Sequence, residues 1–531
     1  MFIENIIKQD YKQWQGGDTV IINSGTATGK SSFIKKQLLP HAHAEEHEIL
    51  FIISRSSLEH QFVHELCQIF ELDFSKIRGL KYFEFYGITV TTYQYLQERL
   101  KRGEDPNFFY IVADEIHYLF SDSAFNPDTF FFFEWIMKKT NSVLIYMSAT
   151  IKNVLPYLGF YNAKWIPIDD DNDYRNLFVR NSLDIIKNLK KIPDFLYYYK
   201  LEARKPHFNL HCFEDFDELA KNINESDSNE KWLIFINNKD KIKKLQSKLK
   251  CHSLLAVAES KKEESIQRML FTKKYEAQVL FATKFLDVGV NLIDSQITNV
   301  VIYSIEEESF LQMVGRRRPI SGENKSVNLF LPKLSLQYFQ CLLRQKIEPT
   351  LKFLKTDTNT LLEKMLKSSE DYLQAKKFCY CKNGTLHINP IAIDYYENRK
   401  KFCLKMSHEF KTNEFAFLQE QLRWLDMEHR FDEVIFLSNT YKDIYKKELL
   451  LFLQMCAQKE LDAEQQALFR SKMHFFILKL TPNLLSHPNK IPGKTIINKA
   501  LALFDLPYCI TSKKSHKKGI DTTWTLIKKE V

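Results

Sequence analysis

The amino-acid sequence predicts an α/β protein with two tandem parallel-sheet lobes, followed by a mainly helical C-terminal domain. Short apolar runs alternate with longer amphipathic stretches over residues 1–168 and again over residues 206–340. The short runs are apolar almost throughout, which is typical of parallel strands covered by helices on both faces of the sheet. After residue 340 the pattern becomes helical, with long charged amphipathic stretches.

Individual strands follow from the position of each apolar run. In the first lobe they are expected at 19–23, 49–53, 88–92, 109–113 and 143–147. In the second lobe they are expected at 208–212, 232–236, 279–282, 299–303 and 327–331. An acidic, polar stretch at 169–173 interrupts the alternation, so residues 169–205 are predicted to be a linker.

The C-terminal third is predicted to contain a helical accessory domain over 341–490 and a basic segment over 491–531. A hairpin over 378–388 should turn at its Asn-Gly pair. Residues 491–531 hold eight lysines against three acidic residues, and a helix, a strand, a basic tip and a second strand follow one another. This order resembles a winged helix, although a solvated lysine loop on a small helical cap remains an equal alternative. The tip would bind nucleic-acid backbone through Lys513, Lys514, Lys517 and Lys518.

Composition excludes several other classes of protein. The chain has 531 residues, a formal net charge of +9 and 44% hydrophobic residues, which is too apolar for a disordered chain. Its nine cysteines are scattered without a C-x-x-C pair, which argues against zinc ribbons and secreted disulfide frameworks. The sequence has neither a signal-peptide core at its N-terminus nor a run of 18 apolar residues. A cytoplasmic protein is therefore expected.

A glycine-containing loop directly after the first strand predicts a phosphate site. Residues 24–31 read S-G-T-A-T-G-K-S, which fits the phosphate-loop pattern except for the serine at its start. Small residues let backbone N–H groups surround phosphate oxygens, a lysine reaches the β and γ phosphates, and a serine hydroxyl can ligate Mg²⁺. A chance match is less favoured because a strand precedes the loop and a helix follows it. The candidate nucleotide-binding residues here are Gly25, Thr26, Thr28, Gly29, Lys30, Ser31 and Ser32.

Paired acidic residues follow the fourth predicted strand, at Asp114 and Glu115. Two carboxylates at a strand end can divide the work of hydrolysis. Asp114 would hold Mg²⁺ together with Ser31, and Glu115 would orient and deprotonate the attacking water. Taken alone, the acidic pair could equally be a solvated turn after a strand.

With these motifs in this order, the chain resembles a superfamily 2 helicase of the DExH-box (DEAD/DEAH-box-like) type. The resemblance covers residues 10–335 and implies two RecA-like motor lobes that use ATP and Mg²⁺. Its further motifs are matched at 54–61, 91–94, 148–150, 235–239, 282–292 and 312–318.

The resemblance implies a role for each motif residue. Lys30, Asp114, Glu115, Gln312, Arg316 and Arg318 would be catalytic, and Asp287 and Gly289 would help to bind the nucleotide. Ser54, Arg55, Thr92, Asn237 and Thr283 would contact nucleic acid. His117, Ser148, Thr150 and Asn291 would couple the two sites. The last motif ends in Pro319 where an arginine is common, which leaves the role of Arg318 open.

No clear adenine-reading glutamine motif precedes the phosphate loop. Tyr11, Gln13, Trp14 and Gln15 are candidates, but an amphipathic helix face is the favoured interpretation.

The favoured function is an ATP-dependent helicase or translocase, with DNA preferred over RNA because of the basic, winged-helix-like end. An alternative is a nucleotide-switched nucleic-acid-binding module of a defence or mobile-element complex, without processive unwinding. A phosphate-loop kinase is a weaker third hypothesis, because the second lobe and its last motif have no place in it. The C-terminal third would be the region that contacts a protein partner.

Overall fold

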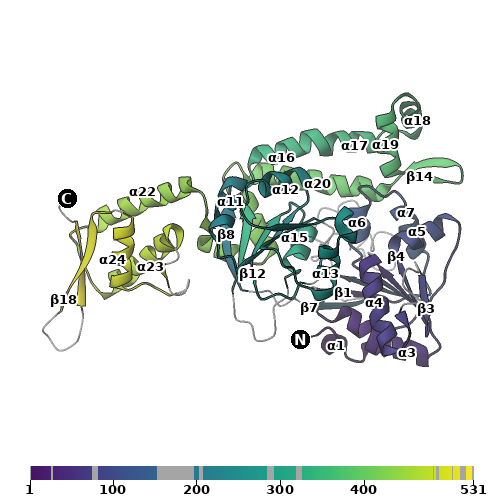
Figure 1. The fold of residues 1–531 in the computed structure, drawn as a ribbon. Helices are drawn as coiled ribbons and strands as arrows, with labels where there is room; N and C mark the ends of the chain where they lie inside the picture. The colour runs from purple at the N-terminus through teal and green to yellow at the C-terminus, as the bar shows by residue number, and fades with distance from the viewer. Residues whose placement is uncertain are drawn as a thin grey trace, which may run out of the picture. The chain divides into compact units, whose positions relative to one another are not determined.

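The chain forms two compact units in the computed structural model (Figure 1). The residues described are 2–25, 28–54, 56–74, 82–151, 196–201, 207–283, 292–317, 326–481, 484–485, 490–504, 506–514 and 522–528. The first unit is built from the chain up to residue 205 and from residues 336–412. The second unit is built from residues 206–286, 291–335 and 413–531.

The first unit contains a seven-stranded sheet in the order β3-β4-β2-β5-β6-β1-β7. Every neighbouring pair is parallel except β3 with β4. All the strands predicted for this lobe are confirmed, and β7 adds six residues of the predicted 169–205 linker to the sheet. The strands are β1 Thr19–Ser24, β2 Ile49–Ile53, β3 Tyr82–Phe85, β4 Ile88–Thr92, β5 Tyr110–Asp114, β6 Val143–Ser148 and β7 Leu196–Leu201.

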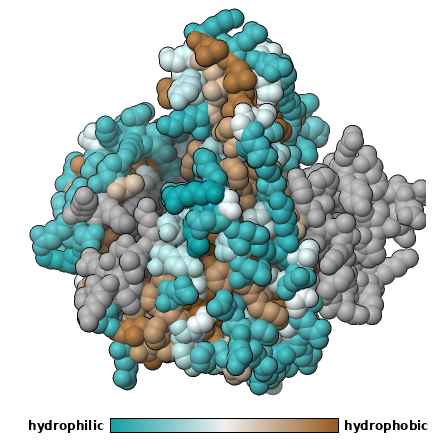
Figure 2. Space-filling model, turned by 90° about the vertical axis from the view of Figure 1, so that its right-hand side faces the viewer, coloured by the Kyte–Doolittle hydropathy of each residue, from teal (hydrophilic) through white to brown (hydrophobic). Residues whose placement is uncertain are grey.

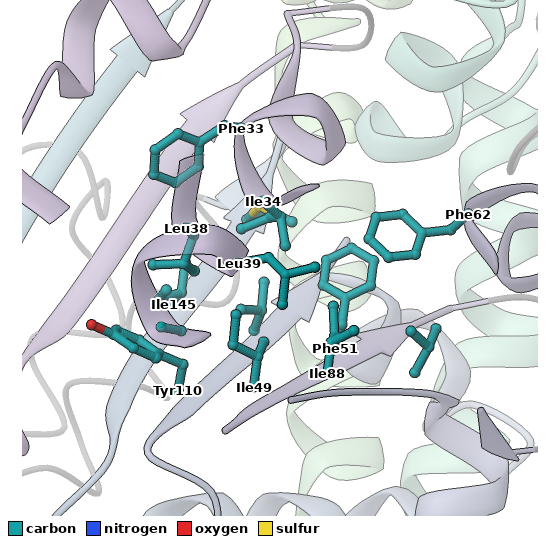
Figure 3. Packing of buried hydrophobic residues seen from close by; sticks show 14 of the residues in the cluster. Phe33, Ile34, Leu38, Leu39, Ile49, Phe51, Phe62, Ile88, Tyr110 and Ile145 are labelled. Carbon is teal, nitrogen blue, oxygen red and sulfur yellow. The ribbon is translucent and has the colours of Figure 1, made fainter. Parts of the chain in front are cut away.

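Alternation along the strands feeds two hydrophobic cores, one on each face of this sheet. In β2, Phe51 packs into one core while its neighbours Leu50 and Ile52 pack into the other. Figure 3 shows the first core, where Phe33 and Leu38, from the helical stretch that follows β1, lie against strand residues. The helices of this lobe are α1 Glu4–Ile7, α2 Lys30–Phe33, α3 Leu39–Ala44, α4 Ser56–Ile69, α5 Tyr93–Lys101, α6 Tyr118–Asp122 and α7 Thr129–Met137.

The second unit repeats this strand order in a sheet that is parallel throughout, β10-β11-β9-β12-β13-β8-β16. β8 takes the place of β1, β12 that of β5, and β16 that of β7. The strands are β8 Phe208–Phe213, β9 Lys231–Ile236, β10 Ser253–Ala256, β11 Val279–Ala282, β12 Ile297–Tyr303, β13 Val327–Pro332 and β16 Ile435–Phe436. Its helices include α11 Phe216–Glu225, α12 Lys239–Gln246, α13 Glu264–Thr272, α15 Glu307–Val314 and α21 Ala416–Trp424.

Residues 336–412 return to the first unit, so the stretch predicted as one accessory domain, 341–490, is divided between the two units. Ile391 of α20 packs against Phe120 and Phe133 of the first lobe. The Asn389 side chain donates to the Thr129 hydroxyl over 2.7 Å. This region contains α16 Leu336–Leu342, α17 Glu348–Leu354, α18 Thr358–Lys367, α19 Ser369–Phe378, β14 Cys379–Lys382, β15 Thr385–Ile388 and α20 Pro390–Glu409.

The two helices α18 and α19 carry apolar side chains exposed to solvent. Leu366 is 88% exposed, and Leu362, Tyr372 and Leu373 are also exposed. Figure 2 shows hydrophobic residues at the top of the view, where these helices lie. The hairpin predicted over 378–388 is confirmed as β14 and β15.

The C-terminal end of the second unit has the connectivity of a winged helix. α22 Asn439–Cys456, β17 Glu460–Leu461, α23 Ala463–Leu480, α24 Lys494–Leu503, β18 Tyr508–Lys514 and β19 Thr522–Lys528 follow one another, and the strand order is β17-β19-β18. The Asn498 side chain bonds both the N–H and the C=O of Ile510, which fastens α24 to β18. This connectivity starts at residue 439, whereas the sequence analysis expected a winged-helix-like segment over 491–531.

Candidate functional site

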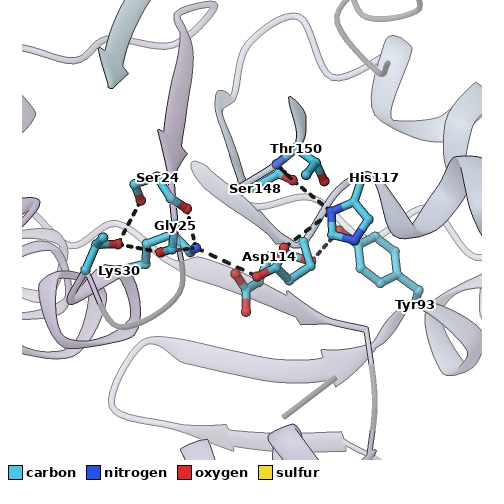
Figure 4. A network of polar contacts seen from close by, with 10 residues as sticks. Ser24, Gly25, Lys30, Tyr93, Asp114, His117, Ser148 and Thr150 are labelled. Carbon is cyan, nitrogen blue, oxygen red and sulfur yellow. Dashed lines mark hydrogen bonds and ion pairs between the residues drawn. The ribbon is translucent and has the colours of Figure 1, made fainter. Parts of the chain in front are cut away.

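The carboxyl ends of three adjacent strands, β1, β6 and β5, meet at one edge of the first sheet. Neighbouring strands lie about 4.8 Å apart, so groups that follow these three strands can reach one another. The phosphate loop follows β1, Ser148 ends β6, and Asp114 ends β5. This edge therefore brings together most of the first-lobe residues singled out from sequence (Figure 4).

The described part of the phosphate loop is held by its own side chains. The Lys30 ammonium donates to the carbonyls of Ser24 and Gly25 over 2.8 and 3.2 Å. The Thr28 hydroxyl donates to the Gly25 carbonyl over 2.8 Å. Gly29 has φ +86°, in the left-handed region that favours glycine, and no side chain caps the helix that starts at Lys30. The first N–H groups of that helix are thus left for an anion.

The acidic pair lies next to this lysine. Glu115 Oε1 is 3.7 Å from Lys30 Nζ. Glu115 has φ +50°, an uncommon conformation for a residue with a side chain. Burial, with the nearby Glu115 charge, raises the pKa of Asp114 to about 7.

The first lobe offers a fit for Mg²⁺. Asp114 is buried, and its Oδ1 atom accepts no hydrogen bond. Ser31 lies one residue after Lys30, at the start of the helix. A buried carboxylate oxygen without a donor suits a hard cation, and Mg²⁺ would lower the pKa of this carboxyl. The described residues contain no cluster of three or more acidic, histidine or cysteine side chains that could hold a metal ion without further ligands.

A polar chain links the acidic pair to the end of β6. The Nδ1 atom of His117 lies 3.3 Å from Glu115 Oε2 and 2.8 Å from the Ser148 hydroxyl. The Thr150 N–H donates to the same hydroxyl over 2.9 Å. Hydrogen bonds therefore join His117, Ser148 and Thr150, three of the residues assigned to coupling, and the His117 ring lies beside the Glu115 carboxylate.

Two residues expected to contact nucleic acid lie at the same sheet edge, at the ends of β2 and β4. Ser54 directly follows β2 and is buried. Thr92 ends β4, and its side chain accepts from the Tyr95 N–H, which caps α5. Tyr93, to which the sequence analysis assigned no role, donates its hydroxyl to the Asp114 carbonyl over 3.0 Å. Its place inside a recognised motif was the one signal that could have found it.

The N-terminal segment packs directly on the phosphate loop. The Ile3 N–H donates to the Thr28 carbonyl over 2.8 Å. A Cβ placed on Gly29 would lie 3.2 Å from the Phe2 ring, and Phe2 is 54% exposed. Tyr11 and Trp14 are instead buried in the first core, as the amphipathic interpretation predicts. Sequence inspection missed Phe2, since nothing local distinguishes it from any other apolar residue.

The candidate residues of the second unit lie on separate elements. Asn237 follows β9 and is exposed, and Thr283 follows β11. Gln312 lies on α15 and is buried, as is Arg316 just beyond its end. The neighbouring Arg317, not singled out from sequence, donates from Nε to the Ile297 carbonyl over 3.3 Å.

Several candidates cannot be placed. The backbones of Lys513 and Lys514 belong to β18, but their side chains lie outside the described atoms. The candidates that lie outside the described residues altogether are Thr26, Arg55, Asp287, Gly289, Asn291, Arg318, Lys517 and Lys518.

Two family models match the chain, one on each lobe. Residues 2–153 match the model for the type III restriction enzyme, res subunit, and residues 214–318 match the model for the helicase conserved C-terminal domain. Together the two matches support the assignment to the superfamily 2 helicases, with one motor domain in each lobe. The DExH subtype stays a prediction. No curated protein gives a significant match.

Solved structures of helicases show a distant likeness. Mss116p bound to ssRNA and AMP-PNP is 16% identical, with 75% of this chain and 84% of that chain covered and a TM-score of 0.40. A DEAD box protein from Methanococcus jannaschii is 16% identical, with 62% and 86% covered and a TM-score of 0.32. Helicase Lhr from Mycobacterium smegmatis, bound to ssDNA and AMP-PNP, is 13% identical, with 71% and 57% covered and a TM-score of 0.38. At these scores, no argument about substrate rests on them.

Among the parts of the chain that the structure describes, no helix is long and apolar enough to cross a membrane.

Proposed function

We propose that the chain hydrolyses ATP and couples hydrolysis to movement along a nucleic-acid strand, as a helicase or translocase. The single observation that carries this proposal is the 3.7 Å approach of Glu115 to Lys30, at an edge where the phosphate loop and the acidic pair meet. A phosphate-binding lysine beside a carboxylate that can activate water is the arrangement that phosphoryl transfer to water requires.

Each group at this edge has a task in hydrolysis. Lys30, which bonds loop carbonyls in this structure, would exchange them for the β and γ phosphates of ATP. Ser31 and Asp114 would hold Mg²⁺, which supplies charge neutralisation at the phosphates when bound. Glu115 would orient the attacking water and accept its proton. Arg316, with Gln312, would stabilise the charge of the transferring phosphoryl group.

The half-exposed ring of Phe2 would lie beside the nucleotide base. It stands at the loop that holds the phosphates, and it presents one apolar face to solvent. Aromatic rings stack on bases without reading their edges, so this contact would favour a nucleotide over free phosphate rather than ATP over GTP.

Nucleic acid would bind along the other half of the same sheet edge, through Thr92 beside the buried Ser54, and through Asn237 and Thr283 of the second lobe. Hydroxyl and amide side chains suit phosphate and sugar contacts. DNA is favoured over RNA because the chain ends in a basic winged-helix module, and helix–turn–helix modules of this kind read duplex DNA.

The proposal is tested by measuring phosphate release against a panel of single- and double-stranded DNA and RNA at two salt concentrations. We expect nucleic acid to stimulate hydrolysis, with DNA more effective than RNA, and stimulation to weaken at the higher salt. Hydrolysis that no nucleic acid stimulates would contradict the proposed function. Stronger stimulation by RNA would contradict the DNA preference alone.

A second candidate function is a nucleotide-switched binding module without processive unwinding. The winged-helix-like end supports this candidate, because such a module would bind nucleic acid without help from the motor lobes. A strand-displacement assay distinguishes the two candidates, because a switched module hydrolyses ATP without displacing a strand.

A further inference from the structure

A buried hydrogen bond of Tyr93 connects the end of β4, where a nucleic-acid strand would bind, to the end of β5, where the acidic pair lies. This connection is separate from the hydrogen bond between His117 and Ser148. Tyr93 follows Thr92 directly and opens α5. Its ring is fully buried, stacked on Tyr118 with centroids 5.5 Å apart and edge-on to Phe132 at 5.0 Å. Its hydroxyl donates to the backbone carbonyl of Asp114 over 3.0 Å (Figure 4).

This hydrogen bond fixes a peptide group next to Glu115, because its acceptor is the Asp114 carbonyl. The Asp114 carbonyl belongs to the peptide group that joins Asp114 to Glu115, and the orientation of that peptide sets the φ angle of Glu115. That angle is +50°, which costs free energy for a residue with a side chain and persists only when the surroundings hold it. Tyr93 therefore holds the peptide that aims the Glu115 carboxylate.

A second contact runs parallel to the first. The Gln94 side chain, from the next residue of α5, donates to the hydroxyl of Tyr118. Tyr118 opens α6, the helix that begins one residue after His117. The turn that ends β4 is thus attached on both sides of the acidic motif, at Asp114 and at Tyr118.

We propose that Tyr93 and Gln94 are positioning residues that transmit strand binding at Thr92 to the Glu115 carboxylate. A strand phosphate bound at Thr92 shifts the first turn of α5, and the two contacts carry that shift to the peptide and helix on either side of Glu115. This inference rests on the proposed function, because it concerns how nucleic acid accelerates hydrolysis.

The chemistry of the tyrosine suits this task. Burial, together with the nearby acidic groups, raises the pKa of Tyr93 well above its usual range. The hydrogen bond to the Asp114 carbonyl itself requires the hydroxyl to be a donor, because a carbonyl oxygen can only accept. Phenylalanine at this position would keep the ring packing and remove only the donor.

The test compares Tyr93→Phe, Gln94→Ala and the control Tyr95→Phe, which removes a hydroxyl two residues along the same helix. The rate of phosphate release is measured at saturating ATP, with and without a saturating single strand. Strand affinity is measured separately by fluorescence anisotropy without nucleotide. We expect Tyr93→Phe to lower the strand-stimulated kcat three- to tenfold, the effect of losing one buried hydrogen bond, with the KM for ATP and the strand Kd within twofold of wild type.

Gln94→Ala changes an exposed residue, so folding is preserved, and it should lower the stimulated kcat by a smaller factor. Tyr95→Phe should match wild type. The inference is overturned if Tyr93→Phe and Gln94→Ala are both stimulated as strongly as Tyr95→Phe, or if the strand Kd rises in step with the loss of rate. If no strand stimulates the wild-type protein, the proposed function itself is wrong. If strands stimulate the wild type and both variants equally, only the present inference is wrong.

Discussion

The two seven-stranded sheets share one strand order but differ at a single corresponding turn. In the first sheet β1 leads into a glycine-containing loop, and the helix that follows has no side-chain cap. In the second sheet β8 leads into Asp215, whose carboxylate accepts from the N–H groups of Asp217 and Glu218 over 2.8 and 2.9 Å. The corresponding helix N-terminus has no side-chain cap in the first lobe, whereas the Asp215 carboxylate caps it in the second lobe.

Under the proposed function, this difference assigns nucleotide binding to the loop and not to the shared fold. Free N–H groups and a positive helix end attract a phosphate, whereas a carboxylate in the same position occupies those donors and repels the phosphate. One scaffold can therefore serve as a catalytic lobe or as a lobe that contributes only side chains such as Arg316. The predictions below test this contrast.

The largest effect is expected at the first turn. Lys30→Ala or Glu115→Gln should lower ATP hydrolysis by about 10²–10³-fold or more, since each removes a charged group aimed at the reacting phosphate. Phosphate release measures the loss, and circular dichroism checks that the fold is intact. Turnover close to that of wild type in either variant would show that the nucleotide site has been placed at the wrong edge.

The next test concerns a buried lysine that lies next to β16, the edge strand of the second sheet. Lys479 is buried in α23, donates to the Val434 carbonyl next to β16, and lies 5.2–5.8 Å from the rings of Phe436, Tyr445 and Phe475. Burial lowers its pKa from 10.5 to about 8. At 1.36 kcal/mol for each pKa unit, the buried charge costs roughly 3 kcal/mol below pH 8.

The free energy of unfolding depends on pH here because the folded and unfolded chains bind a proton on Lys479 with different pKa values. Between pH 8 and pH 10.5 the unfolded chain holds a proton on Lys479 that the folded chain has released, so this group makes the free energy of unfolding rise with pH. Lys479→Met should therefore be more stable than wild type by up to about 3 kcal/mol below pH 8, and the gain should vanish towards pH 10.5. Urea denaturation over this range measures it, with the exposed Lys472→Met on the same helix as control. A gain that does not change with pH would contradict the assignment.

A smaller effect is expected at the end of the chain. Changing Lys513, Lys514, Lys517 and Lys518 to glutamine should weaken DNA binding about tenfold at low salt. It should also flatten the salt dependence, by up to roughly 0.9 in slope for each lysine that contacts a phosphate. The matched control removes the same charge from the exposed helices of the first unit, at Lys364, Lys367, Lys376 and Lys377. Equal losses from both quadruple variants would mean that net charge alone, and not the tip, attracts DNA.

The smallest effect is expected at the closed turn of the second sheet. Asp215→Ala removes the cap of α11 and should cost about 1 kcal/mol of stability, measured by urea denaturation. ATP hydrolysis should remain within twofold of wild type, because no nucleotide is expected there. A large loss of hydrolysis would mean that the second turn also takes part in the chemistry.

Strands buried on both faces were predictable because their composition is distinctive. β2 and β4 were expected over the residues they occupy, whereas β3, β7, β10 and β16 were not expected. All four are edge strands, which pair on one side only, and β16 has just two residues, too few to show a pattern.

The site was predictable where one motif carries the chemistry and unpredictable where distant segments meet. Lys30 and Glu115 could be named because their spacing and flanking strands are informative. The approach of Phe2 to Gly29, and of Tyr93 to Asp114, depends on packing and strand register, which leave no local trace in the sequence. The sequence analysis did not find β17 for the same reason, since this two-residue strand becomes visible only when it is paired with β19.

The return of residues 336–412 to the first unit decides how this molecule can be taken apart. The chain passes from one unit to the other near residues 205, 335 and 412, so no single cut releases either unit whole. A chain ending at residue 335 would keep both sheets except for the edge strand β16, yet it would uncover Phe120 and Phe133, which α20 now covers. Such a fragment would tend to aggregate because α20 no longer covers these apolar side chains. Loss of ATP hydrolysis in this fragment would therefore not test the role of the two lobes.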